Sequence, residues 1–375
     1  MQYKTLDSLC KVASGGTPSR SKKEYWDGGD IPWIKIGNIK SKVVSNADEY
    51  ITEAGLNNSS AKLFKKGTIL YTIFATLGEV GILDFDACTN QAIAGISIEK
   101  PEEITTDYLY YYLKSKKAEV NQIGRGVAQN NINLSILRKF SIPLRDIEDQ
   151  KTIVGFLNKV ESIIEKQKRQ LERLDELIKA RFVEMFGNVV ANDKGWPTEP
   201  ISKAAPTSSP KIKNNETVWL LNLDMVESQS GKVISKLIVS EDKINASTCT
   251  FDENNVLYSK LRPYLNKVVL PDQEGYCTTE LVPLRPGKEL TREFLATLLR
   301  SDAFVGYINE KTAGAKMPRV SMNIFRQFEC ILPPIALQQQ FSEFYNQVDK
   351  SKFAVQKSLE KTQLLFDSLM QEYFG

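Results

Sequence analysis

Short polar loops carry the residue types best suited to chemistry in this chain. The segments 15–25 (GGTPSRSKKEY) and 124–133 (GRGVAQNNIN) set arginine, lysine, asparagine or glutamine beside turn residues, and so do 207–213, 259–264 and 311–319. Arginine and lysine match guanine edges and phosphates, whereas asparagine and glutamine match adenine edges. One such loop alone is most simply a solvated turn, but their recurrence in both halves of the chain favours contact with nucleic acid. The candidate contact residues are Thr17, Ser19, Arg20, Lys22, Lys23, Lys35, Asn38, Lys40, Arg125, Gln129, Asn130, Asn131, Lys211, Lys213, Lys260, Arg262, Tyr264, Lys311, Lys316 and Arg319.

The residues and motifs of common enzymes are missing. The chain contains no histidine, which excludes Ser-His-Asp and Cys-His nucleophiles, histidine general bases and histidine-containing metal sites. Its five cysteines are far apart and form no CxxC pair. The two Gly-Lys dipeptides lack the neighbours of a phosphate-binding loop, and no spaced carboxylate motif suits metal-assisted hydrolysis. We therefore expect no catalytic, cofactor or metal site in this chain.

An internal duplication organises the sequence. Val160 corresponds to Val348, and the Phe-Gly ending at residue 187 corresponds to that at residue 375, both at an offset of 188 residues. A weaker match links Trp33 to Trp219 at an offset of 186. The repeat predicts two variable domains that alternate with two helices. The expected boundaries are 1–144, 145–187, 188–332 and 333–375.

Each repeated C-terminal segment has the apolar spacing of a coiled coil. Alternating steps of three and four from Leu157 meet mostly apolar residues and continue to Arg181 and Met185. The first helix would span about 55–60 Å, and the second begins where the second variable domain ends, so chain order favours an antiparallel pair. The alternative is two separate helices, each packed on its own domain. The expected helix-pair interface consists of Leu157, Val160, Ile164, Leu171, Leu174, Ile178, Val348, Val355, Leu359, Phe366 and Leu369.

The variable domains mix strand and helix patterns. Runs rich in β-branched and aromatic residues predict strands, and longer amphipathic runs predict helices. The expected strands are 31–39, 68–73, 93–98, 218–223 and 256–258, and the expected helices are 107–120 and 291–308. The fold class is therefore α+β: two mixed α/β domains separated by a long antiparallel two-helix coiled coil, with a pseudo-two-fold internal repeat.

Composition bounds the setting of the protein. The 375 residues are 42% hydrophobic and 25% charged, which is typical of a globular protein. A net charge of +3 is small for a sequence-independent DNA binder. The N-terminus has no signal-peptide pattern, and the most apolar stretch, 69–83, is too short to span a bilayer. Unpaired thiols are typical of a reducing compartment, so we expect a cytoplasmic protein without a membrane partner.

Two blocks of the sequence resemble a known family. Residues 15–40, GGTPSRSKKEYWDGGDIPWIKIGNIK, resemble the opening block of the DNA-specificity domains of type I restriction–modification systems, which runs G-G-T-P-S, a polar stretch, Y-W, G and I-P-W. Residues 126–150, GVAQNNINLSILRKFSIPLRDIEDQ, resemble that family's G-x-x-Q-x-x-I/L block before a helix start. Residues 314–340, GAKMPRVSMNIFRQFECILPPIALQQQ, repeat it more loosely, and the second copy lacks G-G-T-P-S and the Y-W pair. The resemblance covers essentially the whole chain.

This resemblance implies a non-catalytic specificity (S) subunit of a type I restriction–modification complex. Its variable domains would be target recognition domains, each reading one half of a bipartite, asymmetric site in double-stranded DNA. Its helices would set the spacer and dock two modification (methyltransferase) subunits, which bind S-adenosylmethionine and methylate adenine N6. Restriction subunits would add translocation and cleavage that depend on ATP and Mg. The alternative from another class is a coiled-coil scaffold with two peptide- or glycan-binding domains.

Overall fold

The structure, a computed structural model, divides into two compact units. It describes residues 2–125, 131–212, 216–245, 247–312 and 318–375. The first unit comprises Met1–Lys166 and Ser358–Gly375, and the second comprises Gln167–Lys357. Each unit contains one half of each long helix, α6 (Ile147–Phe186) and α11 (Ile335–Phe374). In the ranges just given, no helix is both long and apolar enough to cross a membrane.

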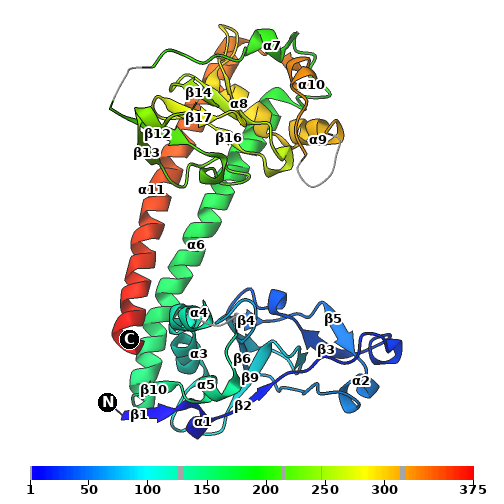
Figure 1. The fold of residues 1–375 in the computed structure, drawn as a ribbon, viewed down its shortest axis with the longest axis vertical. Helices are drawn as coiled ribbons and strands as arrows, with labels where there is room; N and C mark the ends of the chain where they lie inside the picture. The colour runs from blue at the N-terminus through cyan, green and yellow to red at the C-terminus, as the bar shows by residue number, and fades with distance from the viewer. Residues whose placement is uncertain (1, 126–130, 213–215, 246, 313–317) are drawn as a thin grey trace. The chain divides into compact units, whose positions relative to one another are not determined.

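The first unit is mixed α/β. Its sheets have the strand orders β2-β9-β6-β7-β4, β5-β3-β8 and β1-β10. Figure 1 shows α3 and α4 beside the part of α6 that belongs to this unit. Its elements before α6 are β1 (Gln2–Thr5), α1 (Leu6–Leu9), β2 (Cys10–Ser14), β3 (Ile31–Ile34), β4 (Val43–Val44), β5 (Glu49–Ile51), α2 (Glu53–Asn57), β6 (Ile69–Thr72), β7 (Val80–Leu83), β8 (Cys88–Thr89), β9 (Ile93–Ile98), α3 (Thr106–Ser115), α4 (Lys117–Arg125), α5 (Leu134–Arg138) and β10 (Ser141–Leu144).

The second unit repeats this architecture. Its sheets have the orders β13-β12-β17-β14, β16-β15-β18 and β11-β19. The parallel pair β12/β17, with Leu221 opposite Cys277, repeats the pair β3/β8, with Trp33 opposite Cys88. The elements between the long helices are β11 (Thr198–Pro200), α7 (Ile201–Ala204), β12 (Thr217–Leu221), β13 (Leu237–Ser240), β14 (Thr248–Phe251), β15 (Val256–Ser259), β16 (Val268–Val269), β17 (Gly275–Thr278), β18 (Leu281–Leu284), α8 (Arg292–Arg300), α9 (Asp302–Glu310), α10 (Met322–Arg326) and β19 (Glu329–Ile331). The mixed fold class and the duplication are thus confirmed.

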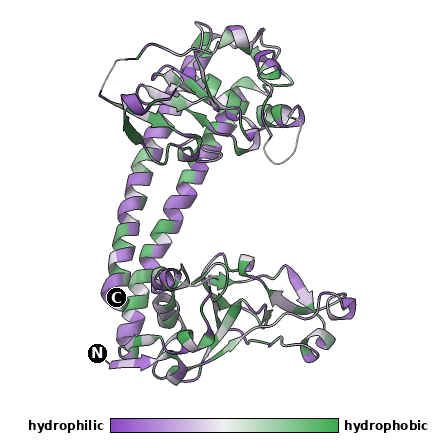
Figure 2. Cartoon of the chain, in the orientation of Figure 1, coloured by the Kyte–Doolittle hydropathy of each residue, from purple (hydrophilic) through white to green (hydrophobic). Residues whose placement is uncertain are grey.

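The long helices pack on each other within each unit. In the first unit the N-terminal half of α6 shares a core with the C-terminal half of α11, and in the second unit the opposite halves meet. The two segments therefore run antiparallel in each unit. Figure 2 shows hydrophobic residues recurring among polar ones along both helices. All eleven positions expected at the interface are buried or half-buried: Leu157, Val160, Ile164, Leu171, Leu174, Ile178, Val348, Val355, Leu359, Phe366 and Leu369.

The buried stripe of α6 departs from the predicted register after Ile178. Arg181 is exposed, whereas Phe182 and Phe186 are almost fully buried. A strict 3.5-residue repeat drifts against the 3.6 residues per turn of a straight helix, so the buried position moves by about one residue. Phe182 and Phe186 thereby reach Phe294, with ring centroids 5.4 Å and 4.7 Å from its ring.

The two helices expected in the variable domains are each divided. The run 107–120 forms α3 and α4, which separate at Lys116, and the run 291–308 forms α8 and α9, which separate at Ser301. Ser301 is extended, and its hydroxyl accepts a hydrogen bond of 3.3 Å from the backbone N–H of Phe304. Serine favours such an N-cap over a helix interior, and this explains the second division.

The packed rings of Phe182, Phe186 and Phe294 in the second unit lead to a prediction on stability. Phe186→Ala removes a fully buried ring and should lower the free energy of unfolding of this unit by about 3–5 kcal/mol. Val183→Ala, on the same helix at a side chain that is 58% exposed, should change it by less than about 0.5 kcal/mol. Urea titrations of both variants measure the difference. Equal losses would contradict the assignment of Phe186 to this core.

Candidate nucleic-acid interface

A stacked arginine dominates the first polar loop of the first unit. The guanidinium of Arg20 lies 3.6 Å from the ring centroid of Trp26 and 4.9 Å from that of Trp33. The two indoles meet edge to face, with centroids 5.1 Å apart. Each indole N–H donates to the backbone of the same loop, that of Trp33 to Gly16 at 3.0 Å and that of Trp26 to Ser19 at 3.2 Å. The aromatic pair therefore holds a half-exposed, planar cation in a defined orientation.

One carboxylate connects two of the expected contact residues. Glu49 of β5 lies 2.5 Å from Nη2 of Arg20 and 2.5 Å from Nζ of Lys35. The hydrogen bond from Lys35, followed by that from Arg20, holds the pKa of the Glu49 carboxyl below its usual value. Glu49 was missed by sequence reasoning, because it is brought to the loop by pairing between β5 and β3, where it lies opposite Trp33. That pairing leaves no signal in the local sequence.

The remaining candidates of this region differ in accessibility. Asn38 is buried, and its amide accepts from the backbone N–H of Lys35 and donates to Asp48, both at 2.9 Å. In this conformation Asn38 shapes the turn and does not face a ligand. Thr17 is half-buried and donates to Gln91, and the ammonium of Lys22 lies 2.9 Å from the hydroxyl of Tyr25. Ser19, Lys23 and Lys40 are exposed.

The second polar loop of the first unit ends beside the residues that follow β6. Asn131 forms an isolated bridge with Phe74, and the backbone N–H of Ile132 donates to Ile73 at 3.1 Å. Gln129 and Asn130 lie outside the described residues, as does the side chain of Arg125.

Two of the polar loops of the second unit come together. The backbone N–H of Arg262 donates to Pro318, and that of Val320 donates to Lys260, both at 2.8 Å. This bridge between 260–262 and 318–320 repeats the bridge between Phe74 and Asn131 in the first unit.

Glu280 holds an arginine in this second cluster, much as Glu49 does in the first. The carboxylate of Glu280 lies 2.7 Å from the guanidinium of Arg319, whose side chain is 62% exposed. Arg262 adopts a left-handed conformation with φ of 49°, and Tyr264 is exposed. Lys311 is exposed over the ring of Tyr307, with Nζ 4.6 Å from its centroid. Lys316 lies outside the described residues.

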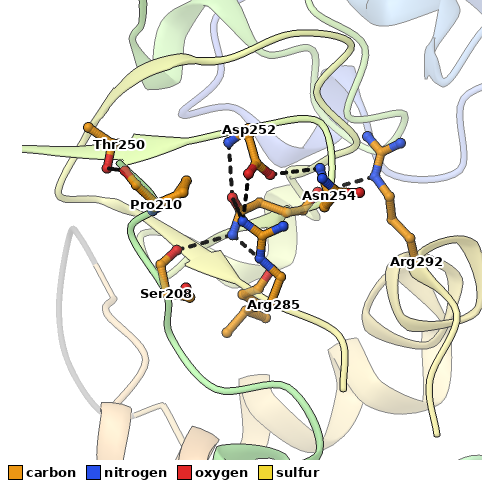
Figure 3. A network of polar contacts seen from close by, with 9 residues as sticks. Ser208, Pro210, Thr250, Asp252, Asn254, Arg285 and Arg292 are labelled. Carbon is orange, nitrogen blue, oxygen red and sulfur yellow. Dashed lines mark hydrogen bonds and ion pairs between the residues drawn. The ribbon is translucent and has the colours of Figure 1, made fainter. Parts of the chain in front are cut away.

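A partly buried polar network anchors the segment that leads to Lys211 (Figure 3). The amide of Asn255 donates to the backbone carbonyl of Ser208 at 3.1 Å, and Thr250 donates to that of Pro210 at 2.6 Å. Arg285 pairs with Asp252 at 2.7 Å, and this contact contributes to a lowered pKa of the Asp252 carboxyl. These contacts stabilise the loop. Lys211 is exposed, and Lys213 lies outside the described residues.

The four buried thiols, those of Cys10, Cys88, Cys277 and Cys330, are unsuited to nucleophilic chemistry or metal binding. Burial raises the pKa of Cys10, Cys277 and Cys330 to about 12 and that of Cys88 to about 11. A thiol rather than a thiolate is then present at neutral pH, and the thiolate is the reactive form. No cluster of cysteine and carboxylate side chains in the described parts of the chain could hold a metal ion.

The carboxylate of Glu49 generates a prediction on titration. Because its folded-state pKa is depressed, its ion pairs stabilise the fold above the ordinary pKa, and that contribution is lost as the pH falls through the folded-state value. Lys35→Met removes the largest cause of the depression and should raise the pKa of Glu49, as measured by NMR titration of its carboxyl carbon. The pKa of Asp86, lowered by the separate partner Lys65, serves as the control and should not change. An unchanged pKa of Glu49 would refute the pairing.

Comparison with known proteins identifies the family. A family model described as "type I restriction modification DNA specificity domain" matches residues 1–174 and 199–364. The MjaIX specificity subunit of Methanocaldococcus jannaschii is 36% identical over 213 residues, which cover 52% of this chain and 49% of the relative. The EcoR124I/EcoR124II specificity subunit of Escherichia coli is 28% identical over 183 residues, 47% of this chain and 45% of the relative. The chain thus spans about half the length of these two curated relatives.

Two solved structures share the fold over the full chain. The S subunit of a type I restriction–modification system from M. genitalium has a TM-score of 0.54 at 15% identity, and the match covers 100% of this chain and 96% of that one. A chain from a structural study of complex assembly and conformational transition in the type I system has a TM-score of 0.57 at 14% identity, with 100% and 97% covered. At these identities the structures show the fold alone. The family model, however, covers most of both copies, and the chain therefore belongs to the type I restriction–modification DNA-specificity family.

Proposed function

We propose that this chain is the specificity subunit of a type I restriction–modification complex and that it reads a bipartite DNA site. The supporting observation is the duplicated fold, which presents a set of polar loops on each of two recognition lobes, residues 1–144 and 188–332. Each lobe reads one half of an asymmetric sequence in double-stranded DNA. The long helices set the spacer between the two halves.

The contacts divide into base-reading and phosphate-binding groups. Arg20 and Arg319 are held by a carboxylate, and Arg20 is also stacked on Trp26, so their orientation suits directional contact with base edges. Exposed lysines such as Lys23 and Lys40 suit phosphates, which carry no sequence information. A few oriented arginines, rather than a large positive surplus, agree with a net charge of +3.

Catalysis resides in partner subunits of this complex. Two modification subunits bind S-adenosylmethionine and methylate adenine N6, and restriction subunits supply translocation and cleavage with ATP and Mg. The target adenine must leave the DNA stack to be methylated, a step that belongs to the modification subunits. The complex acts in the cytoplasm.

Repeated exposed leucines support docking of two identical partners on the helices. Leu177 of α6 is 47% exposed and Leu365 of α11 is 51% exposed, and they occupy equivalent positions 188 residues apart. Leu177 belongs to the second unit and Leu365 to the first. Each unit therefore presents the same apolar side chain, and two copies of one modification subunit can use the same contact.

The methylation specificity of the assembled complex tests the function. Co-expression of this chain with its modification subunit should yield N6-methyladenine within one discontinuous DNA sequence, mapped on a plasmid library by single-molecule sequencing. Replacing residues 1–144 with another recognition lobe should change one half-site. The other half-site and the long helices α6 and α11 should not be affected. A complex that methylates no discontinuous sequence would refute the proposal. A lobe exchange that changes both half-sites would refute the division of labour.

The leucines provide a second test. Leu177→Asp and Leu365→Asp should each reduce the complex from two modification subunits to one, and the double variant should bind none, as measured by native mass spectrometry. Both side chains are exposed, so circular dichroism of the free chain should not change. Glu172→Lys and Glu360→Lys, an equivalent exposed pair roughly 140° around the same helices from the leucines, serve as controls and should retain both partners. Retention of two partners by the double leucine variant would exclude this surface.

A further inference from the structure

A buried glutamine lies at the start of the first long helix. Gln150 has no exposed surface and is the fourth residue of α6. Its amide oxygen accepts from the backbone N–H of Thr105 at 2.9 Å. Its amide nitrogen donates to the backbone carbonyls of Glu103 at 2.7 Å and Arg145 at 3.0 Å. One side chain thus joins α6 to the segment before α3 and to the short segment between β10 and α6.

The second unit contains the same arrangement. Gln338 also has no exposed surface and is the fourth residue of α11. It accepts from the backbone N–H of Thr291 at 3.0 Å and donates to the carbonyls of Glu289 at 2.8 Å and Pro333 at 2.7 Å. All three hydrogen bonds are therefore repeated, although the two lobes differ in most of their sequence.

The chemistry of these contacts requires glutamine but places few demands on the lobe. One acceptor and two donors in a single plane are all used, and a glutamate would present a carboxylate to two carbonyl oxygens. Every partner atom belongs to the backbone. This set of three hydrogen bonds, called the glutamine clamp below, therefore does not depend on the side chains of the lobe. An unpaired buried polar group costs about 1–3 kcal/mol, which makes the three bonds mutually dependent.

The clamp acts at the point where a lobe joins its helix. Thr105 and Thr291 are the N-caps of α3 and α8, and their hydroxyls accept from Tyr108 at 3.4 Å and Phe294 at 3.3 Å. Among other elements of the lobes, α3 and α8 share a core with the long helices of their own unit. The glutamines therefore fix the direction in which each of these lobe helices leaves its long helix.

We propose that Gln150 and Gln338 are positioning residues that set the orientation of each recognition lobe on its long helix through backbone contacts alone. The proposal rests on the function given above, since orientation of a lobe matters for reading a half-site at a fixed spacer. Because only backbone groups are held, the sequence of the lobe is free to change with the DNA sequence it reads. The role does not include contact with DNA.

Hydrogen exchange on the free, full-length chain tests the clamp without DNA. Gln150→Met keeps the approximate length of the side chain and removes all three hydrogen bonds. The amide of Thr105 should lose protection by about tenfold, the factor expected for one buried hydrogen bond. Protection at Thr291 should not change, and Gln338→Met should give the converse pattern. Unchanged protection at Thr105 in the first variant would overturn the clamp.

Spacer selectivity in the complex with modification subunits tests the positioning role. In both variants the preference for the native spacer over one longer by a base pair should fall about tenfold, while both half-site sequences stay the same. Gln170→Met and Gln340→Met, at exposed glutamines on the same two helices, should retain the full preference. Lower thermal stability with an unchanged spacer preference would show a merely structural residue and overturn the proposal.

The two hypotheses fail in different ways. If the wild-type complex methylates no bipartite site, the proposed function is wrong, and the positioning role falls with it even where hydrogen exchange supports the clamp. If the wild type is selective and Gln150→Met is equally selective, only the positioning role is wrong. Should Gln150→Met not fold, Gln150→Glu, which keeps the shape and the acceptor, must show the same loss of spacer preference, and its absence would count against the proposal.

Discussion

Two equivalent ring contacts join the long helices to the mixed α/β part of each unit. Tyr108 of α3 meets Phe374 of α11 at 5.1 Å, and Phe294 of α8 meets Phe186 of α6 at 4.7 Å. A long amphipathic helix gains most of its stability from packing of its apolar face. These contacts cover the C-terminal ends of the apolar faces of α6 and α11. They also place the N-caps of α3 and α8 beside the buried glutamines Gln150 and Gln338. The lobe sheets and their loops are then fixed relative to that half of the helix pair.

Ion pairs with carboxylates orient several of the basic side chains in the lobes, and the net surplus of basic residues is small. Glu49 pairs with Arg20 and Lys35, and Glu280 pairs with Arg319. Such pairs contribute little to stability when exposed, but they restrict the orientations that a long cationic side chain can take. Restricted arginines discriminate between base edges, whereas free lysines bind any phosphate. The small net charge of +3 is consistent with this division under the proposed function.

The duplication could be predicted because the same residues recur about 188 positions apart, and the helix pattern could be predicted because its apolar spacing is local. Packing and strand pairing could not. The register of α6 fails at Arg181 because the strict repeat drifts against the true helical period and Phe182 is buried instead. Asn38 looks like an adenine reader in the sequence, but turn geometry buries its amide against Lys35 and Asp48. Glu49 and Glu280 become visible only once β5 pairs with β3 and the loop around Lys260 closes on residues 318–320.

Under the proposed function, the two types of contact in each lobe would let one scaffold serve different DNA sequences. Attachment to the helices uses contacts outside these loops: the ring contacts of Tyr108 and Phe294, the bonds of Gln150 and Gln338 to backbone groups, and the backbone pairing of β1/β10 and β11/β19. The contacts expected to read DNA use side chains on loops, including Arg20 and Arg319. Backbone hydrogen bonds are indifferent to side-chain identity, so substitutions in the loops leave the attachment unchanged. Change of specificity and retention of geometry are therefore physically separate in this fold.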